Sequence, residues 1–180
     1  MDKTNSANAG TENQVGRSRR GPIPADIKPD DVCAIVDTRE QTPLDLTPLM
    51  TVAGTLATGD YSIKGLENVV TIERKSLNDL LCCCGRERER FDREVLRLLA
   101  YPTRALIVES TWAEIEAGEW RSELTPPHVL GSLLGWVTAG LPIIMATDHA
   151  RAGRFVSRIL FTAARRRWRE ARELLKGGAA

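Results

Sequence analysis

Two acidic residues and a lysine in the middle of the chain have types and spacing that could build a metal site. Glu73 and Lys75 stand two positions apart in an apolar run, so in a strand their side chains share one face while Arg74 points to the other. Asp60 opens the preceding short run and can approach Glu73 across a strand pair. Carboxylates suit Mg²⁺ or Mn²⁺, which bind through one or two of them and keep several waters. Such an ion could supply a hydroxide and polarise a phosphoryl oxygen, and the lysine could orient the attacking water or offset developing charge.

Each of these residues also has a structural explanation. A carboxylate beside a lysine is usually a solvated surface pair that adds little stability. Here the pair closes a hydrophobic strand and is coupled to Asp60, which favours the metal site. Asp79, further along, completes a Ser-x-x-Asp capping pattern that begins at Ser76. Capping of a helix is therefore its first expected role, and support of the metal its second.

Asp37 is a third acidic candidate. It follows the continuous apolar run 32–36, which predicts a strand buried on both faces. Its carboxylate would emerge at the end of that strand, with a route to the same site. The alternative is a loop aspartate that bonds to its own backbone. Arg39 and Glu40, which come next, are interpreted as structural or substrate-contacting residues rather than metal ligands.

The elements that must position these side chains begin with a β-hairpin. Short runs of β-branched or aromatic residues flank residues 64–68, whose glycine and asparagine suit a tight reversal. Gly59 would let the backbone bend sharply before Asp60. Residues 47–54, upstream of the hairpin, are expected to form a short helical or irregular link.

Downstream of the hairpin, helical and strand patterns alternate. A short helix should end near Gly85, and residues 86–100 form an amphipathic pattern with charges paired at i,i+3 and i,i+4. The order strand, hairpin, helix, strand, helix, strand, helix describes an α/β domain, and periodicity alone gives no finer topology. The remaining expectations are strands at 105–109 and 141–146, helices at 111–117, at 125–140 and from 147 or 148 onward, and inward-facing Trp112, Ile115, Val129, Leu133, Leu134, Trp136 and Val137.

Length and composition indicate one domain. A chain of 180 residues can bury a real core. Residues 1–28 are polar and basic, which predicts a disordered tail before a domain at 29–176 and a flexible end at 177–180. Four cysteines, three of them adjacent, lack zinc spacing and do not suit a disulfide framework. With no run of transmembrane length and no signal-peptide core, we expect a soluble cytoplasmic protein without membrane contact.

The formal net charge is only +1, so attraction to phosphate must come from local basic clusters. One cluster follows the candidate site closely and could contact a nucleic-acid backbone, although a solvent face laced with salt bridges also explains it. A second surrounds a tryptophan in the last helix, where it could bind phosphate and stack on a base, or complement the helix dipole. The residues concerned are Arg86 and Arg88, then Arg165, Arg166, Arg167 and Trp168, with Arg17, Arg19 and Arg20 as a smaller cluster in the tail.

The motifs combine into a family signature. Gly59-Asp60, Glu73-Arg74-Lys75 and Asp79 match the pattern GD-xn-ERK-x3-D, on which the chain resembles the XPF-type structure-specific endonucleases. The segment 36–40, Val-Asp-Thr-Arg-Glu, resembles the V-D-x-R-E segment of that family. Residues 90–98 and 105–109 look like its next helix and core strand. The resemblance covers roughly residues 32–165.

This resemblance implies a restriction-endonuclease-like fold, in which helices flank a mixed central β-sheet and the site lies at one sheet edge. It implies a Mg²⁺- or Mn²⁺-dependent DNA endonuclease that uses in-line attack of metal-bound water, at branched or junction DNA in repair, recombination or replication. It also implies that Asp37, Asp60 and Glu73 hold the metal. Lys75 would be the catalytic lysine, and the supporting residues would be Arg39, Glu40, Arg74 and Asp79.

The sequence departs from the family at its end. Many members continue into a tandem helix-hairpin-helix domain, whereas this sequence stops at residue 180, so we expect a stand-alone nuclease domain. A homodimer through that domain, and a bacterial or viral origin, fit this form. The rival is a non-catalytic DNA-binding or scaffold module of the same fold, although such members usually have broken acidic or lysine positions. A nuclease acting on RNA or single strands is the third possibility, because residues around a hydrolytic metal do not distinguish sugars.

Overall fold

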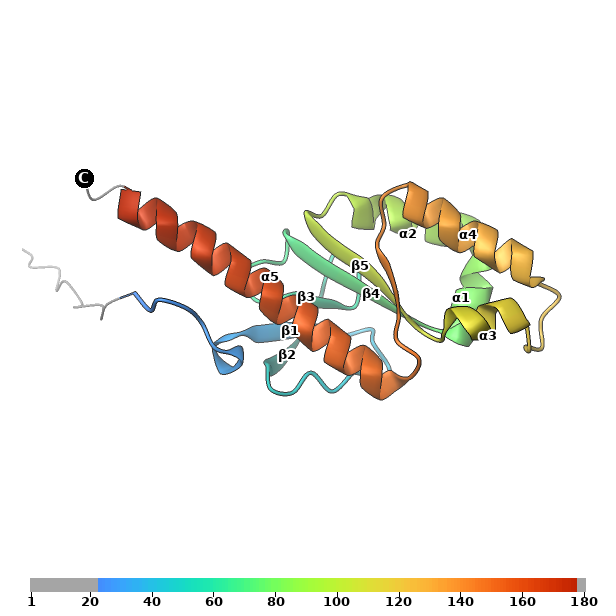
Figure 1. Ribbon diagram of the computed structural model, residues 1–180, viewed down its shortest axis with the longest axis horizontal. Helices are drawn as coiled ribbons and strands as arrows, with labels where there is room; N and C mark the ends of the chain where they lie inside the picture. Colours follow the sequence, from blue (N-terminus) through green and yellow to red (C-terminus); the bar gives the residue numbers. More distant parts are fainter. Residues whose placement is uncertain (1–22, 178–180) are drawn as a thin grey trace, which may run out of the picture.

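A six-stranded mixed sheet forms the centre of the molecule (Figure 1). The computed structural model describes residues 23–177. The strand order is β2-β1-β3-β4-β5-β6, in which β3 runs antiparallel to both of its neighbours and the other pairs are parallel. This arrangement confirms the expected α/β class, with a mixed sheet of the restriction-endonuclease-like kind. The strands are β1 (Cys33–Asp37), β2 (Met50–Gly54), β3 (Tyr61–Ile63), β4 (Val70–Ser76), β5 (Thr103–Glu109) and β6 (Ile143–Met145).

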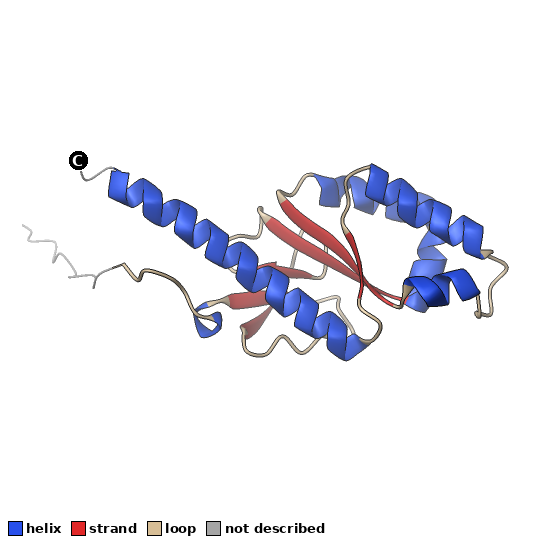
Figure 2. Cartoon of the chain, viewed as in Figure 1, coloured by secondary structure: helices blue, strands red, loops and turns tan. Residues whose placement is uncertain are grey.

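Helices cover both faces of the sheet (Figure 2). The longest helix, α5, lies across β3, β4 and β5, and its Val156 and Leu160 join one buried core. The other face carries a second core, in which Phe91 and Leu133 lie in one cluster with Leu106 and Val108 of β5. The helices are α1 (Leu77–Cys84), α2 (Arg88–Leu99), α3 (Trp112–Ala117), α4 (Pro126–Thr138) and α5 (His149–Gly177), with a short 3₁₀ turn, η1 (Pro29–Asp31), before β1.

The hairpin formed by β3 and β4 confirms the sequence prediction, whereas the expected link at 47–54 was wrong. Residues 50–54 instead form β2, which pairs in parallel with β1 at the sheet edge. Four of the five residues of this edge strand are exposed, so it lacks the continuous apolar run that identifies a buried strand. Contact with β1 is close, because a Cβ on Gly54 would lie 2.9 Å from the Ile35 side chain.

The helix boundaries follow the capping signals. The Ser76 hydroxyl accepts from the backbone N–H of Asp79 (3.2 Å), and Gly118 ends α3 in the left-handed region with φ 67°. The core faces were predicted less well, because Trp112, Leu134 and Val137 are 40%, 55% and 43% exposed. On α4 the inward stripe is narrow, and the two mispredicted residues each follow a buried one, which turns them about 100° away. The buried hydrophobic residues of the two helices are Ile115, Val129, Leu133 and Trp136.

The long helix α5 packs tightly at one end and carries an N-terminal segment at the other. A Cβ on Gly153 would lie 2.5 Å from the Asp45 carbonyl oxygen, so the helix backbone rests on the loop between β1 and β2. Residues 23–28, assigned from the sequence to the polar tail, lie along its C-terminal half, where Asp26 pairs with two arginines. The tail arginines at 17, 19 and 20 and the end at 178–180 lie outside the described residues. No helix within 23–177 has the length and apolarity to cross a membrane.

Candidate active site

The register of β4 against β5 decides which candidate side chains share a face. Glu73 stands opposite Leu106, and Lys75 stands opposite Val108. Both β5 residues belong to the core beneath α1, α2 and α4. Arg74, between them, points to the α5 face, as the alternation of a strand requires. The acid and the lysine are therefore on one side of the sheet.

The turn before β3 brings a second carboxylate to this face. Gly59 has φ +76°, and a Cβ there would lie 2.2 Å from the Thr71 hydroxyl, so glycine is required. The backbone N–H of Asp60 donates to the Ile72 carbonyl (2.8 Å). The Asp60 carboxylate accepts from the backbone N–H of Arg74 (2.8 Å). Strand β4 thus fixes Asp60 through both its backbone and its side chain.

Glu73 and Lys75 form a buried ion pair. The Lys75 ammonium donates to the Glu73 carboxylate and lies 5.4 Å from the centroid of the Phe91 ring. Burial, reinforced by the charge of Asp60, raises the pKa of Glu73 to about 7, and burial also raises the pKa of Asp60. For Lys75, burial opposes the charged form, but the two carboxylates outweigh it and raise the pKa. One ammonium group thus faces two acids, of which Glu73 is buried and Asp60 half-buried.

Asp37 reaches the same edge, but its carboxylate is engaged by its own loop. Its backbone N–H donates to the Asp60 carbonyl (2.8 Å). Its two carboxylate oxygens accept from the Arg39 guanidinium (2.7 and 3.0 Å), and one also accepts from the backbone N–H of Leu56 (2.7 Å). The hydrogen bond from Arg39 outweighs burial and lowers the pKa of Asp37 to about 2. This matches the loop-aspartate alternative, and a metal-binding role for Asp37 stays a prediction.

Glu94 on α2 borders the site and was missed in the sequence. Its carboxylate accepts hydrogen bonds from the Thr58 hydroxyl and from Arg97. Burial alone would raise the pKa of Glu94, but these bonds and the Gly59 backbone amide outweigh it and lower the pKa. The negative charge in turn contributes to the raised pKa of Glu73. The sequence did hold a signal, because Glu94 lies three residues after buried Phe91 and four before buried Leu98, on the inward face of the helix.

Arg74 ties the opposite side of the strand to two other elements. Its guanidinium binds Glu40 in the loop after β1 (3.1 and 3.2 Å) and Glu109 at the end of β5 (2.9 Å). Glu109 also meets the His149 ring nitrogen at the start of α5 (2.7 Å). All three members of the Glu40–Arg74–Glu109 set are largely buried. Glu40 and Arg74 therefore hold the fold around β4 from the face that lies away from Glu73.

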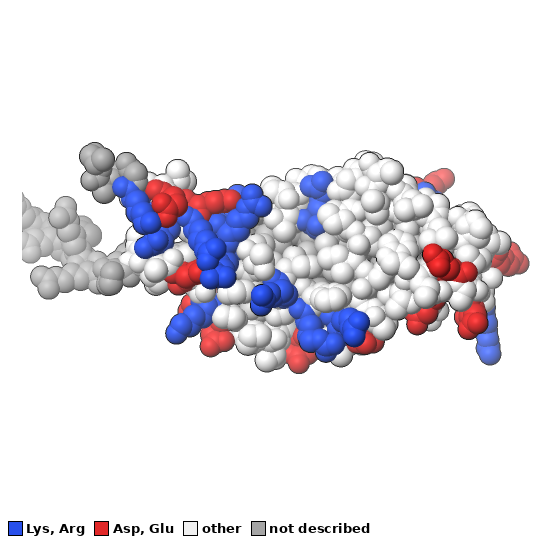
Figure 3. All heavy atoms as spheres, in the orientation of Figure 1, with Lys and Arg blue, Asp and Glu red and all other residues white. Residues whose placement is uncertain are grey.

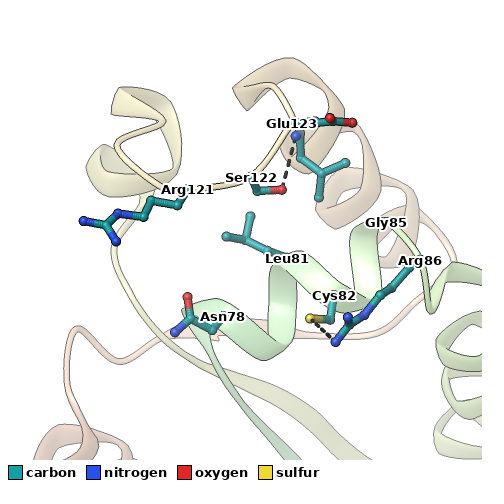
Figure 4. A pocket seen from close by; sticks show the side chains of 9 residues that line it. Asn78, Leu81, Cys82, Gly85, Arg86, Arg121, Ser122 and Glu123 are labelled. Carbon is teal, nitrogen blue, oxygen red and sulfur yellow. Dashed lines mark hydrogen bonds between the residues drawn. The ribbon is translucent and has the colours of Figure 1, made fainter.

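The basic residues near the site have different surroundings. Arg88 binds Asp92 (2.9 Å) and Ser132 (2.6 Å) and stacks over Trp136, so it joins α2 to α4. Arg86 is exposed and contacts only the Cys82 sulfur (3.5 Å) within the described residues. It faces a hollow of about 490 Å³ between α1 and the loop after α3, which Arg121 also lines (Figure 4). Asp79 remains in the cap of α1, where its carboxylate accepts from Ser76 (2.7 Å).

The predicted basic cluster in α5 is largely engaged within the protein. The arginines next to Trp168 form ion pairs with two nearby acidic residues. The indole N–H of Trp168 donates to a backbone carbonyl (3.3 Å). The hydrogen bond holds the edge of the indole against the N-terminal segment, and a stacking role for Trp168 stays a prediction. The partners are Asp26 for Arg165, Glu170 for Arg166 and Arg167, and the Pro24 carbonyl for Trp168.

A divalent cation fits the chemistry of this site. Within residues 23–177, no three carboxylate, histidine or cysteine side chains converge closely enough to hold a metal ion. Buried Glu73 and half-buried Asp60 do supply two carboxylates whose mutual repulsion contributes to the raised pKa of Glu73. Mg²⁺ commonly binds through one or two carboxylates and completes its shell with water. A bound ion would also offset that repulsion.

The fold has counterparts among solved structures. XPF from Aeropyrum pernix superposes with a TM-score of 0.61 at 19% identity, over 79% of this chain and 69% of that one. The same protein in complex with DNA gives 0.60 at 19% identity, over 74% of this chain and 64% of that one. The fold is of the XPF type. No protein-family model matches the sequence, and neither does any curated protein. The likeness to XPF is therefore one of three-dimensional fold, and the roles of the site residues are proposals.

Proposed function

We propose that the protein is a Mg²⁺- or Mn²⁺-dependent endonuclease that hydrolyses phosphodiester bonds in DNA. The observation that carries the proposal is a pair of carboxylates, half-buried Asp60 and buried Glu73, that face one lysine at the β3–β4 hairpin. A structural ion pair needs one acid. Here the charge of a second acid, Asp60, contributes to the raised pKa of Glu73, and such perturbed pairs are typical of functional sites. The XPF-type fold supports nuclease chemistry, and the structure of XPF in complex with DNA supports DNA as the substrate.

The residues would divide the work as follows. Asp60 and Glu73 would hold the ion, which when bound provides a Lewis acid and a water of lowered pKa. Lys75 would keep its positive charge beside them and stabilise negative charge that develops on the phosphate. Asp37 and Asp79 would support the site from the neighbouring strand and helix. Arg74 would anchor β4 through Glu40 and Glu109.

We further propose branched or junction DNA as the preferred substrate, with a role in repair, recombination or replication. This proposal rests on the resemblance of the Gly59–Asp79 motif to structure-specific endonucleases. Self-association through the nuclease domain and a cytoplasmic location stay predictions.

Cleavage assays test the proposed activity. Labelled flap, splayed-arm, Holliday-junction, duplex and single-stranded DNA, and a single-stranded RNA, would be incubated with Mg²⁺ or Mn²⁺. We expect metal-dependent cutting of branched DNA, and a loss of about 10²–10⁴-fold in Asp60→Ala and Lys75→Ala. Asp30→Ala and Lys64→Ala change the same residue types at exposed positions and should cut normally. The ranking of substrates would identify the shape, and the sugar, that the enzyme prefers.

One observation favours the non-catalytic alternative. Arg39 occupies the carboxylate of Asp37, so a DNA-binding module could keep the fold without a complete metal site. Binding of branched DNA without cutting under every metal condition would support that module. Cutting that persists in both site variants would instead show that the active site has been misplaced.

A further inference from the structure

The positive charge of the described chain is concentrated on one helix. Eight arginines and one lysine of α5 stand against two glutamates. Residues 23–148, by contrast, contain 20 acidic and 12 basic side chains, and the whole chain has a net charge of only +1. Figure 3 shows the basic side chains following α5 along its outer face. A polyanion would therefore meet attraction along this helix and repulsion over much of the remaining surface.

Five of the arginines form a stripe along α5. Consecutive members are three, four, seven and four residues apart. At 100° per residue, this spacing places all five side chains within an arc of about 60° on one side of the helix. The stripe runs over about 27 Å at 1.5 Å per residue, which matches roughly eight base pairs of duplex. The members of this arginine stripe are Arg151, Arg154, Arg158, Arg165 and Arg169.

The middle of the stripe is exposed and has no counter-charge. Arg154 and Arg158 are both exposed. The arginines and the lysine of α5 that form ion pairs all lie in its C-terminal half. Within the described residues, neither Arg154 nor Arg158 makes an ion pair or a side-chain hydrogen bond. Among residues 23–177, the Arg151 guanidinium, one turn earlier, hydrogen-bonds only to the Thr147 hydroxyl (3.4 Å). Unpaired guanidinium groups on one line suit a series of phosphates.

Two hollows accompany these arginines, and Phe161 lines both. One, of about 190 Å³, lies between Arg154, Arg158 and the loop before β2. The other, of about 300 Å³, is lined by Arg158, Arg165 and Arg169. The partly exposed phenylalanine between basic side chains offers an apolar contact for sugars, a combination found in surfaces that track a nucleic-acid backbone.

We propose that the arginine stripe binds the phosphate backbone of a second stretch of DNA, on the opposite side of the sheet from Glu73 and Lys75. The inference rests on the proposed function and specifies its substrate. α5 covers one face and the candidate catalytic side chains occupy the other, so a straight duplex cannot lie along both. Branched DNA can place one arm at each surface.

Asp26 limits access to one end of the stripe. Its carboxylate pairs with both Arg165 and Arg169, and their hydrogen bonds lower its pKa, which keeps it ionised. A phosphate must compete with this carboxylate for the two guanidinium groups. Loss of the Asp26 charge should therefore strengthen DNA binding, whereas loss of Arg154 and Arg158 should weaken it.

Binding measurements without divalent metal test the stripe separately from cleavage. Fluorescence anisotropy of a labelled splayed-arm DNA would be recorded from 50 to 200 mM salt. We expect R154Q/R158Q to bind about tenfold more weakly and to reduce the slope of log K against log salt by roughly 2, about one per lost phosphate contact. Asp26→Asn should bind more tightly with a steeper slope. The control K28Q/K64Q removes the same charge at exposed positions off the stripe and should behave nearly as the wild type.

The outcomes separate this proposal from the proposed enzyme activity. If wild type cuts branched DNA and R154Q/R158Q binds and cuts as K28Q/K64Q does, the stripe is not a DNA surface although the nuclease stands. If the stripe variants shift binding as expected but no metal supports cutting, the stripe stands and the nuclease does not. Failure of the wild type to bind any DNA at 50 mM salt would overturn the stripe. Loss of binding to poly-glutamate, but not to DNA, in R154Q/R158Q would also overturn it and indicate an acidic protein partner.

Discussion

At the scale of single residues, Glu94 anchors the turn that leads into Asp60. Its carboxylate accepts a hydrogen bond from the hydroxyl of Thr58, which lies two residues before Asp60. We expect Glu94→Ala to lower kcat for DNA cleavage by about 10- to 100-fold at saturating Mg²⁺, because the turn loses its acceptor and a small displacement of a reacting group is costly. Glu94→Gln retains an acceptor oxygen and should keep most of the activity.

Glu89→Ala is the matched control, since Glu89 lies on the same helix and is exposed. Equal losses of kcat in Glu94→Ala and Glu94→Gln would show that the charge of Glu94 matters rather than its hydrogen bond. That result would contradict a positioning role.

The face on which a side chain lies was predictable where the alternation of a single strand determines it. Alternation along β4 was enough to place Glu73 with Lys75 and to turn Arg74 away. The capture of Asp37 by Arg39 was not predictable in the same way. The geometry of the loop after β1 decides whether that arginine folds back, and spacing alone leaves this open.

At the scale of elements, the junction of α2 and α4 depends on Asp92, which accepts from the Trp136 indole N–H (2.9 Å) and from Arg88 (2.9 Å). Burial opposes ionisation, but these hydrogen bonds outweigh it and lower the pKa of Asp92 from 3.8. A lowered folded-state pKa gives stability that is present above the unfolded-state pKa and is lost as the pH falls through the folded-state value. We expect Asp92→Asn to lower Tm at pH 7 and the gap from wild type to close below pH 3.8. Thermal unfolding followed by circular dichroism from pH 7 to pH 2 measures the gap, and a constant gap would exclude the carboxylate as its cause.

Elements were predictable where a local signal marks them. Ser76 and Gly85 delimit α1, and Thr111 with Glu114 forms the capping box of α3. Strand β2 had no such signal, because an exposed edge strand is identified by its pairing with β1 and not by its own apolar pattern. Arg88 was misleading for a related reason, since its partners Ser132 and Trp136 lie on α4, far along the chain.

At the scale of the whole molecule, the net charge conceals how unevenly the charged residues are distributed. A net charge of +1 gave no indication that α5 is strongly basic and that residues 23–148 are acidic. Periodicity indicated the α/β class, but the sheet order and the placement of α5 on the face opposite Glu73 and Lys75 depend on long-range pairing. These whole-molecule properties are what would allow the two DNA-facing surfaces that we propose.

The stability of the whole molecule should respond to a divalent ion. Asp60 and Glu73 repel each other in the folded protein, so an ion that binds both favours the folded state. We expect Mg²⁺ at a hundredfold excess over Kd to add about 2.7 kcal/mol, which is roughly 5–10 °C in Tm for a chain of this size. Differential scanning fluorimetry at pH 7 with MgCl₂, MnCl₂ or EDTA measures the shift.

Asp60→Asn provides the decisive comparison. An asparagine oxygen can still accept from the Arg74 backbone N–H, so the turn should persist, while the repulsion with Glu73 disappears. The variant should therefore be at least as stable as the wild type in EDTA and should lose the increment from Mg²⁺ and Mn²⁺. An unaltered increment in Asp60→Asn would place the ion elsewhere, for example among exposed surface acids. A wild type that shows no increment would leave Asp60 and Glu73 without a cation, and the nuclease proposal would lose its main support.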